Sequence, residues 1–174
     1  MSSCKCGSRI LRLPLTTPPN NLLPTKDFIM TIKLSSLSAD LSKEREGDWI
    51  PVKEWLGLDP EKPYETTPLP GLEFLVRSTN YPDYVTARQD VLEKLKQEYP
   101  NDKVPSDVQA RFEGQLSVEH LLLGWKGLDV EYSPDLVGTI LVAEEHRVMR
   151  QMIFWCAGRV GKKKVEFVKA ATKN

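Results

Sequence analysis

The sequence predicts an α+β fold that is mainly α, with short N-terminal antiparallel β-strands followed by a small bundle of about four helices. Short runs rich in strand-forming residues occur before residue 78, bounded by proline and glycine. Beyond that point apolar residues recur at steps of three and four, the spacing of helices with one buried face. A length of 174 residues suits one domain with a sizeable core.

Residues 1–29 form a leader that shows neither the helical nor the strand periodicity of apolar residues. Proline and asparagine are dense between Pro14 and Pro24. This composition predicts a disordered segment and leaves residues 30–174 as a single folded domain. A purine-rich ribosome-binding run could encode Lys26-Asp27, just before Phe28-Ile29-Met30. We therefore hypothesise that Met30 is the native start and that the leader is not native.

The β-containing part spans residues 30–77. Thr31–Leu34 predicts a short strand, which is followed by a polar, helix-prone segment that ends at Gly47. Asp48–Val52 is β-prone, but its proline restricts it to an edge strand or a bulge. Leu72–Arg77 follows a Pro-Gly pair and is rich in strand formers, so it predicts the clearest strand of the chain.

A proline-rich segment, Lys53–Pro70, lies between these two strands and has prolines at positions 60, 63, 68 and 70. We expect an extended loop that joins two antiparallel strands, and a loop of this length in a compact domain is usually functional or mobile. Trp55, followed by Leu56-Gly57-Leu58, is hard to bury in a segment that is otherwise polar. Because exposed aromatic side chains favour partner binding, Trp55 is a candidate binding residue.

The helical part spans residues 81–160. Its first helix begins at Pro82, where a missing N–H costs nothing, and ends at Pro100. The helix has one apolar face crossed by an arginine, made of Tyr81, Tyr84, Val85, Arg88, Leu92, Leu95 and Tyr99.

The second helix opens at Ser106, which together with Gln109 predicts a capping box. Gly114 weakens this helix, because glycine has a low helix propensity. Its apolar side contains Val108, Phe112, Leu116, His120 and Leu123.

An abrupt break separates the second helix from the third, in the stretch LLLGWKGLDVEYSPDLVGTILV. Gly124 or Gly127 supplies the left-handed residue that closes a helix. Ser133 caps the next helix and Pro134 takes its first position. We therefore predict a tight helix–helix corner with Trp125 as its packing wedge. The buried stripe of the third helix consists of Leu136, Val137, Ile140 and Leu141.

The last helix is predicted from about Glu145 to Val160. Its inward-facing residues are Val148, Met149, Met152, Ile153, Cys156 and Val160. Residues 161–174 form a polar tail, in which Val165 and Val168 are candidate docking residues. Core packing is the simplest interpretation of Trp125 and Trp155.

Charge and hydropathy argue against binding to nucleic acid or membrane. Lys+Arg and Asp+Glu both number 24, so no net charge attracts a polyanion. The one basic cluster, Lys162–Lys164, is typical of a solvated tail. No apolar stretch approaches the ~20 residues that a membrane helix requires.

The chain shows no motif for catalysis, metal or cofactor binding. It has no glycine-rich phosphate loop and no Gly-x-Ser-x-Gly elbow. His120 and His146 each follow a glutamate, but neighbours in a helix point about 100° apart, so neither forms a ready acid–base pair. Cys4-Lys5-Cys6 lacks the spacing of a zinc knuckle. Three cysteines cannot all pair within one chain, which favours a reduced, cytosolic protein. We predict a protein that is not an enzyme, with no metal and no cofactor.

Four motifs in order give the chain a family resemblance: GDWIPV, PGLEFLVRSTNYPDYVTAR, LLLGWKGLDVEYSPDLVGTIL, and a final helix before a Lys-Asn ending. In this order they resemble the tail assembly chaperones of long-tailed (siphovirus-like) bacteriophages or prophages. The matching positions are Trp49, Arg77-Ser78, Tyr81, Tyr84, Trp125-Lys126-Gly127 and Tyr132-Ser133-Pro134. The resemblance covers residues 30–174, and Lys53–Pro70 departs from it because it is longer than the usual strand connection.

The resemblance implies a non-enzymatic role in the host bacterial cytoplasm. Such chaperones coat the helical tape measure protein, help recruit tail tube protein, and leave before the virion is complete. Many phages also make a longer form of the chaperone by a programmed frameshift, and a slippery adenine run could encode Lys162–Lys164. A coat of this kind needs many weak contacts, so we expect a homo-oligomer.

The corner supplies further candidate partner-binding residues, Trp125, Lys126 and Tyr132, in addition to Trp55. The alternative is that Trp125 and Tyr132 only lock the corner. Two other classes of function stay open. One is a structural virion component, such as a head–tail connector or a minor tail protein; the other is a small enzyme whose centre assembles around His120 or His146.

Overall fold

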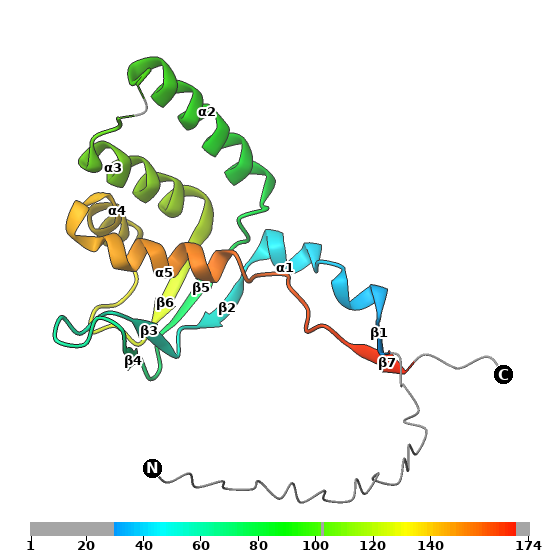
Figure 1. The fold of residues 1–174 in the computed structure, drawn as a ribbon. Helices are drawn as coiled ribbons and strands as arrows, with labels where there is room; N and C mark the ends of the chain where they lie inside the picture. The colour runs from blue at the N-terminus through cyan, green and yellow to red at the C-terminus, as the bar shows by residue number, and fades with distance from the viewer. Residues whose placement is uncertain (1–29, 102, 170–174) are drawn as a thin grey trace, which may run out of the picture.

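The computed structural model describes residues 30–101 and 103–169. The predicted leader, residues 1–29, lies outside the described residues, as do the last five residues of the predicted tail. The described chain has the predicted α+β fold, with helices packed together on one side and short antiparallel strands on the other (Figure 1). Among the described residues, no helix combines the length and the apolar character needed to cross a bilayer.

The central sheet has three antiparallel strands in the order β2 (Asp48–Pro51), β5 (Glu73–Val76) and β6 (Leu122–Lys126). The pairing of β2 with β5 confirms that the proline-rich segment joins two antiparallel strands. Alternate residues of β5, Phe74 and Val76, are buried in the core, and the last helix packs against this strand.

The predicted helix–helix corner is wrong, because residues 122–126 form strand β6 instead of a helix end. The second helix is α3 (Ser106–Leu116), which continues through one π-helical turn, Ser117–Leu121, directly into β6. A short apolar run is compatible with a buried strand as well as a buried helix. Here β5 has a second edge whose backbone groups need partners, and β6 supplies them. Strands are therefore not confined to the N-terminal part.

The proline-rich segment is a hairpin rather than an extended loop. Strand β3 (Glu54–Leu56) pairs antiparallel with β4 (Thr66–Pro68), and the turn between them is closed at Gly57, where φ is +71°. Proline sits at the end of β4, where its missing donor costs little. The period of the sequence could not reveal this pairing, because strands of three residues are too short to show one.

The helical part contains four helices: α2 (Pro82–Glu98), α3, α4 (Pro134–Val142) and α5 (Arg147–Ala157). The predicted cap of α4 is confirmed, since the Ser133 hydroxyl accepts the Leu136 N–H at 3.3 Å. The capping box at Ser106 is not formed: Pro105 precedes the helix, no side chain caps it, and the Gln109 amide donates to Glu113. The predicted last helix is shorter in the structure. A 3-10 turn at Glu144–His146 precedes helix α5, and α5 ends three residues before the predicted end at Val160.

The two ends of the described chain form an arm beside the helices (Figure 1). Strand β1 (Met30–Ile32) pairs antiparallel with β7 (Phe167–Lys169), so part of the predicted polar tail is a strand. Thr31 is opposite Val168 in this pair. A 3-10 turn (Leu34–Leu37) and helix α1 (Leu41–Glu46) connect β1 to the sheet, and α1 ends at Gly47 as predicted. We call residues 30–41 and 162–169 the β1–β7 arm.

The core lies between the sheet and helices α3 to α5. Its fully buried side chains include Val52, Phe74, Val76, Leu121, Val137, Leu141, Ile153 and Cys156. Burial raises the pKa of the Cys156 thiol to about 12, so this cysteine behaves as a small apolar residue at neutral pH.

Candidate partner-binding site

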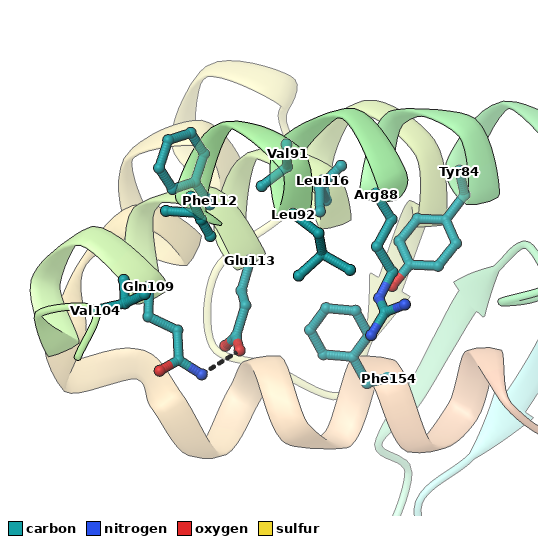
Figure 2. A pocket seen from close by; sticks show the side chains of 11 residues that line it. Tyr84, Arg88, Val91, Leu92, Val104, Gln109, Phe112, Glu113, Leu116 and Phe154 are labelled. Atoms are coloured by element: carbon teal, nitrogen blue, oxygen red, sulfur yellow. Dashed lines mark hydrogen bonds between the residues drawn. The ribbon is translucent and has the colours of Figure 1, made fainter. Parts of the chain in front are cut away.

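An apolar groove of about 540 Å³ lies between α2, α3 and α5. Figure 2 shows side chains from the three helices reaching into one space, with Leu92 and Arg88 coming from α2 and Phe154 from α5. The aliphatic and phenylalanine side chains of the lining are Val91, Leu92, Leu95, Val104, Phe112, Leu116 and Phe154. We call this space the α2–α3–α5 groove.

Helix α2 leaves the groove open because only one of its residues is buried. Tyr84 is the only buried residue of α2, and its ring lies 6.5 Å from that of Phe154, centroid to centroid. Farther along the helix Leu92 is 41% exposed, although the sequence pattern placed it on a buried face. Leucine side chains that line a groove and stay in contact with water favour a partner that covers them.

Two charged side chains line the groove, Arg88 and Glu113. The Glu113 carboxylate accepts a hydrogen bond of 2.8 Å from the Gln109 side-chain amide, as Figure 2 shows. The same carboxylate lies 3.8 Å from the Nε atom of Arg150, which is too long for a hydrogen bond. The groove therefore combines an apolar floor with fixed polar groups at its side.

Trp55 lines a separate hollow of about 670 Å³ between β3 and α5. Its ring meets that of Trp155 edge to face, with centroids 6.0 Å apart. The Arg159 guanidinium lies 4.3 Å from the centre of the Trp155 ring. The prediction that Trp155 packs in the core is wrong, because this residue is 40% exposed. The predicted binding residue Trp55 is half-buried and belongs to an aromatic surface that also includes Trp155.

Trp125 and Tyr132 hold the loop after β6. Trp125 is 6% exposed, and its Nε1–H donates to the Val130 carbonyl at 2.9 Å. The Tyr132 ring meets it edge to face at 5.2 Å, and the Tyr132 hydroxyl donates to the Leu122 carbonyl at 3.4 Å. Burial raises the pKa of Tyr132. These contacts favour the alternative in which both residues stabilise the loop.

Lys126 is exposed at the end of β6, where its Nζ lies 3.9 Å from the centre of the Trp49 ring and 3.9 Å from the Glu73 carboxylate. The structure thus brings together only Trp125 and Tyr132 of the four predicted binding residues. Trp55 and Lys126 lie in other surroundings.

The α2–α3–α5 groove was not predicted as a site. One signal was present in the sequence: the apolar stripe of α2 is crossed by Arg88 and flanked by charges, which is unusual for a helix with one face in the core. The charged residues around this narrow apolar stripe indicate a helix that the rest of the protein covers only in part.

Neither histidine lines the α2–α3–α5 groove or the hollow beside Trp55. His120 Nε2 lies 3.7 Å from Glu119 Oε2, beyond hydrogen-bond distance, and His146 lies in the turn before α5. Within the described ranges, no group of three or more His, Cys, Asp or Glu side chains is placed to hold a metal ion.

Comparison of the chain with protein-family models, with curated proteins and with solved structures finds no match.

Proposed function

We propose that the protein is a tail assembly chaperone of a long-tailed bacteriophage or prophage. In this role it binds the tape measure protein in the host cytoplasm, helps recruit tail tube protein, and leaves before the virion is complete. The order of the motifs from Trp49 to Pro134 supports the family. The open α2–α3–α5 groove supports the mode of binding.

The groove is the single observation that carries the proposal. Helix α2 has 17 residues and is therefore about 25 Å long, which matches several turns of a partner helix. An amphipathic helix binds such a groove by placing its apolar face on the lining and its polar face in water. A tape measure protein presents a long helix of this kind, and shallow grooves on many chaperone copies give the weak, repeated contacts that a removable coat needs.

The second hollow supports a further contact. Trp55, Leu56 and Trp155 expose apolar surface on a face formed by β3 and α5, apart from the groove. A chaperone that holds one protein and recruits another needs two such surfaces, so we assign this one to the tail tube protein. A frameshift-extended form of the chaperone would add a third partner, and ribosome profiling across the codons of Lys162–Lys164 tests for it.

Coexpression tests the proposal directly. The long helical protein encoded next to this chain is expected to be insoluble alone and soluble when both are produced together. Leu92→Gln should weaken binding about tenfold, because a leucine side chain is no longer buried on association. Leu128→Gln is the matched control, since Leu128 is 38% exposed but lies outside the groove lining. Equal solubilisation by Leu92→Gln and wild-type protein would count against the groove.

A structural virion component is the second candidate. The β1–β7 arm favours it, because Ile32 and Phe167 expose apolar surface that suits a permanent interface. Mass spectrometry of purified particles separates the two functions: a chaperone is absent from them, whereas a connector or minor tail protein is present in fixed stoichiometry.

A further inference from the structure

A smaller hollow of about 470 Å³ adjoins the α2–α3–α5 groove and shares Gln109, Glu113 and Phe154 with it. It lies between the first turns of α3 and the beginning of α5, and it is lined by Arg147 and Arg150. Because the two spaces share these three lining residues, a helix bound in the groove would lie beside this hollow and could extend a side chain toward it.

Arg150 is a buried cation that is only partly satisfied. The residue is 4% exposed, and its Nη1 donates to the carbonyl oxygens of Leu141 and Ala143, at 3.0 and 2.6 Å. Its Nε is buried and has no hydrogen-bond partner. The nearest carboxylate, that of Glu113, is 3.8 Å away and bonded to Gln109. An unsatisfied N–H on a buried guanidinium is costly, and this edge of arginine is one that binds carboxylates.

The beginning of α3 adds a second feature that favours an anion. This 11-residue helix has no side-chain cap, and Ser106, Gln109 and Ala110 of its first turns line the hollow. Uncapped N–H groups and the helix dipole attract negative charge at this end. Arg147, exposed in the first turn of α5, contributes a second guanidinium. Glu113 and Glu144 oppose these groups, so the hollow selects one well-placed carboxylate rather than a cluster of acids.

We propose that this hollow is a subsite for a carboxylate of the helical partner: an Asp or Glu at the border of its apolar face, bound by Arg147 and Arg150. The inference rests on the proposed function, because the apolar face of the same helix occupies the groove. Glu113 remains on Gln109 in the complex and limits the affinity by repulsion. The partner is therefore an amphipathic helix with an acidic residue in a fixed register, and this register orients the helix on the chaperone.

Synthetic helical peptides of about five turns test the subsite on the full-length protein. All carry the same leucine stripe; glutamate is placed in turn at each position bordering the stripe, and each peptide has a matched glutamine version. Fluorescence anisotropy measures the affinity. At one position glutamate should bind about tenfold more tightly than glutamine. Arg147→Gln should lower this ratio severalfold, because only Arg150 then remains to bind the carboxylate, whereas Glu113→Gln should increase it severalfold. An unchanged ratio in Arg147→Gln would count against the subsite.

Arg45→Gln is the control for general electrostatics, because Arg45 is an exposed arginine on α1, outside the hollow. A severalfold fall of the ratio in this variant too would overturn the subsite. So would equal affinity of the glutamate and glutamine peptides at every position, but binding of both would leave the groove and the proposed function intact. If neither kind of peptide binds, the groove itself is refuted. Melting temperatures of all variants verify that each is folded.

Discussion

At the scale of single residues, Gly114 marks a place where two helix backbones lie too close together to leave room for a Cβ atom. Gly114 lies in α3 where this helix crosses α4, and a Cβ there would overlap the carbonyl oxygen of Leu141. Because the helix propensity of glycine is low, the sequence predicted only that Gly114 weakens the helix. The structure gives the reason for the glycine: it permits the close approach of two backbones.

Gly114→Ala should therefore destabilise the protein by about 2 kcal/mol or more, because the helices must separate. Gly138→Ala in α4 is the matched control, since nothing lies within 4 Å of its added Cβ. That variant should raise the free energy of unfolding by up to ~1 kcal/mol. Urea denaturation of both variants measures the contrast, and stabilisation by both would contradict the crossing.

Trp125 is a second residue whose role the surroundings define. Trp125→Ala should lower the free energy of unfolding by about 3–5 kcal/mol, because a buried indole and its hydrogen bond to Val130 are lost. Thermal unfolding and tape measure binding are measured on the same sample. An unchanged melting temperature with lost binding would instead assign Trp125 to the partner interface.

At the scale of elements, the arm depends on a pair of strands with little burial. The strands β1 and β7 are exposed throughout, and an ion pair of 2.7 Å between Lys33 and Glu166 lies at the end of the pair. The hydrogen bond and charge of Lys33 hold the pKa of Glu166 below its ordinary value of 4.5. A carboxyl with a lowered pKa stabilises the folded state above 4.5, and this contribution is lost as the pH falls through the lowered value.

The arm should thus loosen below about pH 4.5. Hydrogen exchange reports this at the Lys33 amide, which donates to the Glu166 carbonyl at 2.9 Å. Its protection factor should fall on acidification, whereas that of the buried Val52 amide, which donates to the Leu72 carbonyl next to the sheet, should not. Glu166→Gln should remove the pH dependence; the effect is small, because both charges are exposed to solvent.

At the scale of the whole molecule, exposed large apolar side chains are concentrated on the arm. Among the exposed residues of the arm are Met30, Ile32, Leu34, Leu37, Leu41, Phe167 and Val168. Equal numbers of acidic and basic residues, 24 of each, leave no net charge to keep copies apart. These features support the proposed oligomer.

Light scattering should therefore show association that increases with protein concentration. Replacing Ile32 and Phe167, which are opposite each other in the arm, by threonine should shift the protein toward the monomer. Leu128→Gln removes an exposed leucine elsewhere and should leave the association unchanged. A monomer at every concentration, alone and with tape measure segments, would exclude a coat of contacting copies.

The sequence by itself determined where several helices of this protein begin and end. Pro82 opens α2, Gly47 ends α1, and Ser133 with Pro134 starts α4, as predicted. These signals act on backbone groups a few residues away, so no distant partner is needed to interpret them. The same holds for the α+β class, which follows from the order of the periodic segments.

Only the tertiary structure decided the rest. Residues 122–126 form a strand because the backbone groups at the free edge of β5 pair with them. Residues 167–169 form a strand because they pair with β1. The groove exists because α2 is held at Tyr84 and leaves Leu92 uncovered. In each case the outcome depends on contacts between segments far apart in the chain, and periodicity indicates which residues share a face but not what covers that face.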